Sequence, residues 1–107
     1  MSYPKTYEWV YDEEERMEYY EKTTTDNLIV VASGNTISEI PVVLGVLSKR
    51  DAMRAIDIAK KQIEQNYGGD VYKAEIAKFL VRYDIAYVNS FFKSNPDVSD
   101  VYAKIFT

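Results

Sequence analysis

Apolar positions are densest between residues 71 and 92. On a helical wheel, the polar residues of this stretch fall on one narrow strip, formed by Glu75, Lys78, Arg82, Asn89 and Lys93, and apolar or aromatic residues occupy most of the remaining circumference. Surface helices usually show the opposite proportion, an apolar stripe on a polar rod. The pattern therefore predicts a long central helix at about residues 70–93, which meets water along one edge and which the rest of the chain, or a second copy, has to cover.

Shorter apolar runs earlier in the chain predict β-structure. Residues 28–32 (LIVVA) favour a strand, and the following Gly34 and Asn35 tolerate the positive φ of a two-residue hairpin turn. Residues 36–47 offer the return strand, in which Pro41 indicates an edge position or the end of the strand. We therefore expect a β-hairpin at about residues 28–43, and a short helix over residues 38–47 is the alternative.

Capping signals predict two further helices beside the central one. Ser48 and Asp51 have the spacing of a capping box, which opens a helix at about residues 48–66. Gly68-Gly69 ends that helix, and Asp70 caps the central helix. After Pro96, apolar residues return at helical spacing, which predicts a short C-terminal helix.

The N-terminal part of the chain gives two competing patterns. Alternating residues at 7–11 favour a short strand. Asp12 and Glu15 fit a capping box for a short helix over residues 12–22, although Met17, Tyr19 and Tyr20 also permit a strand there. Together the patterns predict an α+β fold, and residues 1–107 have the size of a single domain.

Composition narrows the function. The chain has no Cys and no His, which excludes thiolate metal sites, disulfides and imidazole catalysis, and no nucleotide-binding or catalytic motif is present. We expect a non-enzymatic protein with no cofactor and no metal site. No apolar run has transmembrane length and no signal peptide is recognisable, so we expect a soluble cytoplasmic protein that does not bind membranes.

The ten tyrosines favour an interaction surface, because Tyr combines a large apolar body with a polar tip. Asp84 lies opposite the polar strip of the central helix, where we expect a buried and satisfied carboxylate. The leading hypothesis is a self-associating interaction module, a homo-oligomer with a possible further protein partner. Its predicted contact residues lie on the tyrosine-bearing side of the central helix and on the C-terminal helix, and they are Tyr72, Tyr83, Asp84, Tyr87, Val101, Tyr102, Ile105 and Phe106.

Two alternatives remain. Residues 38–60 resemble a degenerate helix-turn-helix through Leu44-Gly45-Val46 followed by Ser48-Lys49-Arg50. Its DNA-binding residues would be Lys49, Arg50, Arg54 and Lys61. Acidic residues nearby reduce the positive charge of this face. The other alternative is an acidic decoy that binds a basic protein, as virus- or plasmid-encoded anti-defence proteins do, through Asp12, Glu13, Glu14 and Glu15. The composition, rich in Tyr and free of Cys and His, is similar to that of small archaeal viral or plasmid proteins.

Overall fold

The protein is a bundle of short helices, and the expected β-hairpin does not exist. The computed structural model describes residues 13–65, 69–83 and 85–106, which contain seven helices and no strand. The helices are α2 (Glu13–Glu21), α3 (Thr25–Ala32), α4 (Ile40–Arg50), α5 (Ala52–Gln65), α6 (Gly69–Tyr83), α7 (Ile85–Ser94) and α8 (Pro96–Phe106). The predicted strand at 7–11 lies outside the described residues.

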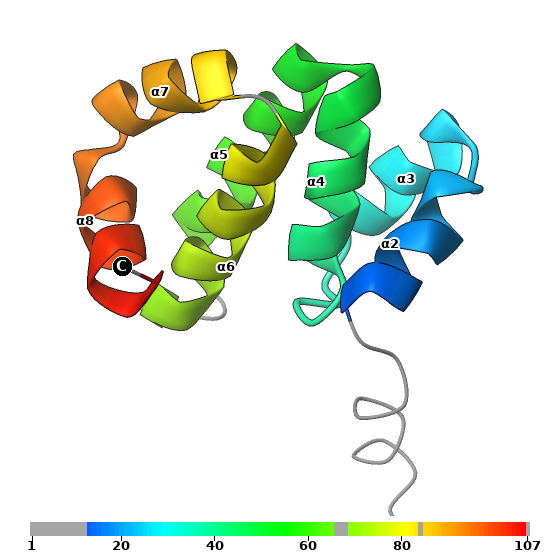
Figure 1. The fold of residues 1–107 in the computed structure, drawn as a ribbon, viewed down its shortest axis with the longest axis horizontal. Helices are drawn as coiled ribbons and strands as arrows, with labels where there is room; N and C mark the ends of the chain where they lie inside the picture. The colour runs from blue at the N-terminus through cyan, green and yellow to red at the C-terminus, as the bar shows by residue number, and fades with distance from the viewer. Residues whose placement is uncertain (1–12, 66–68, 84, 107) are drawn as a thin grey trace, which may run out of the picture.

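Helix α4 occupies the centre of the bundle (Figure 1), with α2 and α3 on one side and α5 and α6 on the other. Every residue from Ile40 to Ser48 is buried. A helix without a polar face must be covered on all sides. Pro41 stands in its first turn, where the missing amide proton costs no hydrogen bond. The helical alternative for residues 38–47 is therefore the correct one, and the hairpin at 28–43 is wrong.

The first half of that hairpin is also helical. Thr24 caps α3, its hydroxyl accepting a hydrogen bond from the Asn27 amide at 3.3 Å. Leu28 and Ala32, four residues apart, point into the core, whereas Val30 is 69% exposed. Five consecutive apolar residues carry no periodicity, so the run itself does not separate a strand from a helix. The signal in the sequence that favours a helix here is Thr24, a residue type that is common at the N-cap.

The predicted central helix is interrupted. Helix α6 ends at Tyr83 and α7 begins at Ile85, and Figure 1 shows α7 turned away from the axis of α6. A straight helix of the 24 predicted residues would be about 36 Å long. Helix α4 has 11 residues and is about 16 Å long, so it would cover only about half of such a helix. After the interruption, α7 places Val88 and Phe91 in the core and packs on α5 and α8 instead.

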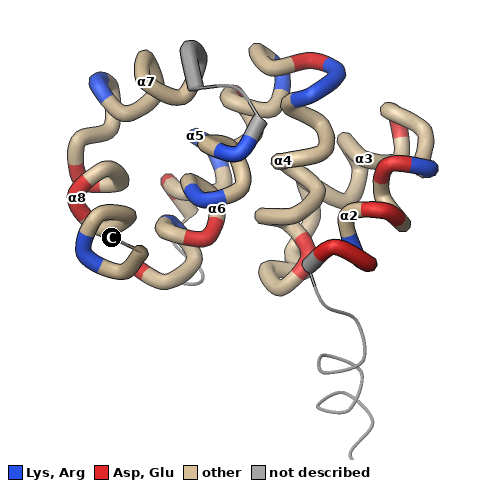
Figure 2. Tube along the Cα trace, in the orientation of Figure 1, with Lys and Arg blue, Asp and Glu red and all other residues tan. Residues whose placement is uncertain are grey.

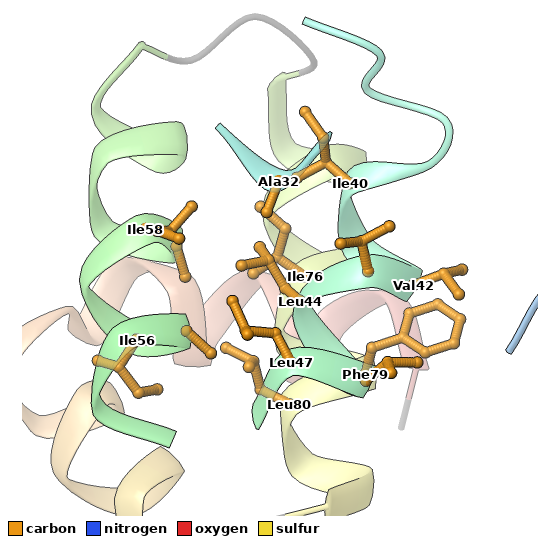
Figure 3. Packing of buried hydrophobic residues seen from close by; sticks show 14 of the residues in the cluster. Ala32, Ile40, Val42, Leu44, Leu47, Ile56, Ile58, Ile76, Phe79 and Leu80 are labelled. Atoms are coloured by element: carbon orange, nitrogen blue, oxygen red, sulfur yellow. The ribbon is translucent and has the colours of Figure 1, made fainter. Parts of the chain in front are cut away.

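The other predicted helices exist with shifted ends. The helix expected at 12–22 is present as α2, and the C-terminal helix is present as α8. The helix expected at 48–66 begins only at Ala52, because residues 48–50 still belong to α4. The buried side chains form one cluster to which every described helix contributes, and Figure 3 shows its centre, where Leu44 and Leu47 of α4 lie beside Ile76 and Leu80 of α6.

Candidate interaction surfaces

A row of aromatic rings connects the core with the surface at α7 and α8. The ring centroids of Phe91 and Phe92 are 6.2 Å apart, those of Phe92 and Tyr102 5.9 Å, and those of Tyr102 and Phe106 5.8 Å. Tilted pairs at these separations are favourable beyond the area that they bury. Phe91 is 1% exposed and Phe106 is 37% exposed, so the row runs from the core to the outside.

Two lysines of α6 hold α8 in place. The Lys78 ammonium lies 5.0 Å from the ring centroid of Phe79 and 5.2 Å from that of Phe106, which is the range of cation–π attraction. Lys73 pairs with Asp97 at 3.5 Å. The sequence predicted Lys78 on the solvent-exposed polar strip of a central helix. In the structure its ammonium group lies against the ring of Phe79 on α6 and the ring of Phe106 on α8.

The predicted contact residues on α8 differ in burial. Val98, one turn before the first of them, is fully buried, and Val101 and Tyr102 are half-buried. Ile105 is 42% exposed. The apolar stripe of α8 therefore begins inside the chain's own core and ends in solvent.

Tyr72, predicted as a contact residue, lies inside the chain. It is buried, and its hydroxyl donates to Gln62 Oε1 at 2.9 Å. Gln62 Nε2 in turn donates to the carbonyl oxygens of Ala32 at 2.7 Å and Gly34 at 3.1 Å, which are left without partners at the end of α3. Burial raises the pKa of Tyr72 to about 12. The side chain joins α5 and α6 and is not available to a partner.

The remaining contact residues, Tyr83, Asp84 and Tyr87, lie outside the described residues or have side chains that do. The described part of α6 is covered by α4 on one side and by α8 on the other. The sequence suggested that the chain has too few other apolar segments to cover this helix, and that a second copy would cover it. The described part of α6 does not need such cover.

Two of the predicted DNA-binding residues, Lys49 and Arg50, make contacts within the chain. The Arg50 guanidinium donates to the carbonyl oxygens of Glu21 and Thr23, both at 2.7 Å, and to the Thr25 hydroxyl at 3.2 Å. Lys49 pairs with Glu21 at 2.7 Å. Both basic residues thus join the end of α4 to the turn between α2 and α3.

The helix-turn-helix prediction places its turn wrongly. The expected turn at Leu44–Val46 lies within α4. The two helices instead meet at Asp51, whose carboxylate accepts a hydrogen bond from the Arg54 amide at 3.2 Å. Arg54 and Lys61 are exposed on α5, with the acidic Asp57 between them in sequence.

The predicted acidic patch is partly neutralised by the chain itself. Glu14 forms an ion pair with Arg82 of α6. Asp12 and the side chain of Glu13 lie outside the described residues. Glu15 lines a depression of about 550 Å³ over α2 that sequence reasoning missed. Its lining residues are Glu15, Arg16, Glu18, Tyr19, Tyr20 and Lys22 of α2, together with Glu39.

A polar cluster forms part of that lining. Arg16 pairs with Glu39 at 3.0 Å and donates to the Ser38 carbonyl, and the Tyr20 hydroxyl donates to Glu39 at 2.6 Å. Arg16 and Tyr20 are one turn apart on α2, which the sequence does indicate. Their shared acceptor is about twenty residues away, and no local pattern connects it to them.

Comparisons of this chain with protein-family models, with curated proteins and with solved structures give no match. Among the described residues, no helix has the length and apolarity needed to cross a membrane. The same residues contain no group of three acidic side chains placed to hold a metal ion. The surfaces described above therefore provide the basis for assigning a function.

Proposed function

We propose that this protein is a non-enzymatic interaction module that self-associates through the exposed end of α8. The observation that supports this proposal is the gradient along the helix. The apolar stripe is buried at Val98, whereas Ile105 and Phe106 at its other end are substantially exposed. Both residues continue the helical spacing of the buried part of the stripe. Exposed apolar surface of this kind at the end of an otherwise docked helix is a candidate contact site.

The exposed flank of α8 is suited to a second copy of the same surface. Beside Val101 and Ile105 lie Asp100 and Lys104, both exposed and opposite in charge. Two such flanks that meet about a two-fold axis would place Asp100 of one copy opposite Lys104 of the other, twice, with the apolar residues between them. A two-fold interface requires this kind of self-complementary patch. Because the patch is small, we expect reversible association that depends on protein concentration.

Molar mass measured by sedimentation equilibrium over a range of concentrations tests the proposal. We expect the mass to rise toward that of a dimer, and Ile105→Glu to hold the protein at the monomer mass. Val30→Glu is the matched control, since Val30 is also an exposed aliphatic residue but lies on α3. A wild-type protein that stays monomeric at every concentration, or equal effects of the two variants, would overturn the proposal.

A charge reversal tests the geometry. Asp100→Lys and Lys104→Asp should each weaken the dimer by placing like charges opposite one another. The double variant restores opposite pairs and should recover most of the association. Continued weakness of the double variant would exclude the antiparallel pairing of α8 helices.

A further inference from the structure

Helix α2 lies at the other end of the molecule from α8 (Figure 1). The depression that its residues line differs from the α8 surface in chemistry. Its volume of about 550 Å³ is within the usual range of ligand sites. Charged residues and two tyrosines line it, rather than aliphatic side chains. It therefore fits a polar or charged group better than an apolar one.

The net charge of the depression depends on which of its lining residues neutralise one another. Arg16 is neutralised by Glu39, which also accepts the Tyr20 hydroxyl, so these groups form a fixed wall. Glu18 is exposed and forms no ion pair with any described residue. Lys22 is the second lining cation, and with Glu15 the lining has three acidic side chains against two basic ones.

The surrounding charge is also negative. Residues 13–35 carry six acidic and two basic side chains, and of these acids Glu14 pairs with Arg82 and Glu21 with Lys49. Figure 2 shows acidic positions following one another along α2. A region of one predominant sign attracts ligands of the opposite sign and raises their rate of association. The field therefore favours a cation at this end of the molecule.

Tyr19 provides an aromatic surface beside this charge. Its side chain is 68% exposed, and its ring meets the buried ring of Tyr20 edge to face, with centroids 5.0 Å apart and an interplanar angle of 82°. The contact with Tyr20 orients the ring while leaving it accessible. An exposed aromatic ring next to a carboxylate is the combination that recognises a guanidinium, which stacks on the ring and donates to the acid.

We propose that the depression over α2 binds an arginine side chain presented by a basic segment of another protein. The guanidinium lies over the Tyr19 ring and donates hydrogen bonds to Glu18, while the Arg16–Glu39–Tyr20 wall limits its depth. Arginine is favoured over lysine because its planar group makes the stacking and the paired hydrogen bonds together. This site is independent of α8 and of self-association.

An NMR titration with three short peptides tests this site. The peptides carry two arginines, two lysines or two glutamates, in each case spaced by glycine. We expect the arginine peptide to shift amide signals of α2 and Glu39, the lysine peptide to bind several-fold more weakly, and the glutamate peptide to cause no shifts. Shifts spread over all acidic surfaces, or equal affinity for lysine and arginine, would overturn the proposal.

Substitutions localise the effect. Tyr19→Leu keeps an apolar side chain but removes the aromatic face, and should weaken binding of the arginine peptide about two- to fivefold. Glu18→Gln should weaken it by a similar factor. Glu64→Gln is the matched control, because Glu64 is an exposed acid on α5 with no place in the depression. An equal loss in the control would mean that only net charge attracts the peptide, and would exclude a built site.

Discussion

Gln62 and Tyr72 show how single polar side chains serve this core. Gln62 is buried, and both ends of its amide are used, by two carbonyl oxygens of the α3 terminus and by the Tyr72 hydroxyl. A buried polar group without a partner costs about 1–3 kcal/mol, so each member of this network depends on the others. The arrangement fixes the end of α3 against α5 and α6.

Alkaline pH should weaken this contact. Burial raises the pKa of Tyr72 from 10.0 to about 12. Because this value lies above that of the unfolded chain, the neutral hydroxyl contributes its full stability below about pH 10, and that contribution is lost as the pH rises through about 12. The total loss is roughly 2–3 kcal/mol.

The experiment compares wild type with Tyr72→Phe in urea unfolding at several pH values. At neutral pH the variant should be less stable by about 1–3 kcal/mol, because the Gln62 oxygen loses its donor. As the pH rises from 10 toward 12, the advantage of the wild type should shrink. A difference that is independent of pH over this interval would contradict the assignment of the raised pKa to Tyr72.

At the level of secondary structure, one residue separates α4 from α5. The sequence suggests Ser48 as the N-cap, with Asp51 as its reciprocal partner. In the structure Asp51 is the capping residue, and the Ser48 hydroxyl donates back to the Gly45 carbonyl at 2.6 Å within α4. The two interpretations assign the stabilising role to different residues.

Alanine substitutions separate them. Asp51→Ala removes the acceptor for the first turn of α5 and should lower the free energy of unfolding by about 1 kcal/mol. Ser48→Ala removes only a local hydroxyl contact and should change it by less than about 0.5 kcal/mol. Thermal or urea unfolding measures both. A larger effect of Ser48→Ala would support a helix that begins at residue 48.

The success of prediction from sequence varied with the kind of signal. Helix α8 was found because its breaker and its apolar spacing agree, whereas for α2 the capping pattern favoured a helix and the apolar residues also permitted a strand. The apolar runs in α3 and α4 were misread, because a fully buried helix lacks the polar face that reveals its period. The prediction of a central helix at about residues 70–93 was wrong, because α4 occupies the centre and that stretch forms α6 and α7. The Gln62–Tyr72 network and the wall of the α2 depression join residues far apart in sequence and could not have been predicted.

At the level of the whole molecule, Arg50 joins the α2–α3 pair to the rest of the bundle. Its guanidinium satisfies two carbonyl oxygens at the end of α2 and near the start of α3, contacts that span more than twenty residues. Because the group is exposed, each bond is worth less than a buried one. The three bonds together nevertheless fix the relative position of three helices.

Arg50→Ala should lower the free energy of unfolding by about 1–2 kcal/mol, and should reduce the hydrogen-exchange protection of α2 more than that of α6. Arg54→Ala is the control, since Arg54 is an exposed arginine four residues later, on α5. We expect it to change stability by less than about 0.5 kcal/mol. Equal losses of α2 protection in the two variants would show that Arg50 does not hold these helices together.

The complete burial of α4 also affects how the chain is made. On the ribosome, α2 and α3 emerge before α4, but α6, its most extensive neighbour, emerges only some twenty residues later. During that interval α5 covers part of this side of α4, but the surface of α4 that α6 covers in the folded protein has no intramolecular cover. Nascent chains with such uncovered segments are prone to aggregation, so we expect the risk of aggregation during synthesis to be highest before residues 69–83 have emerged.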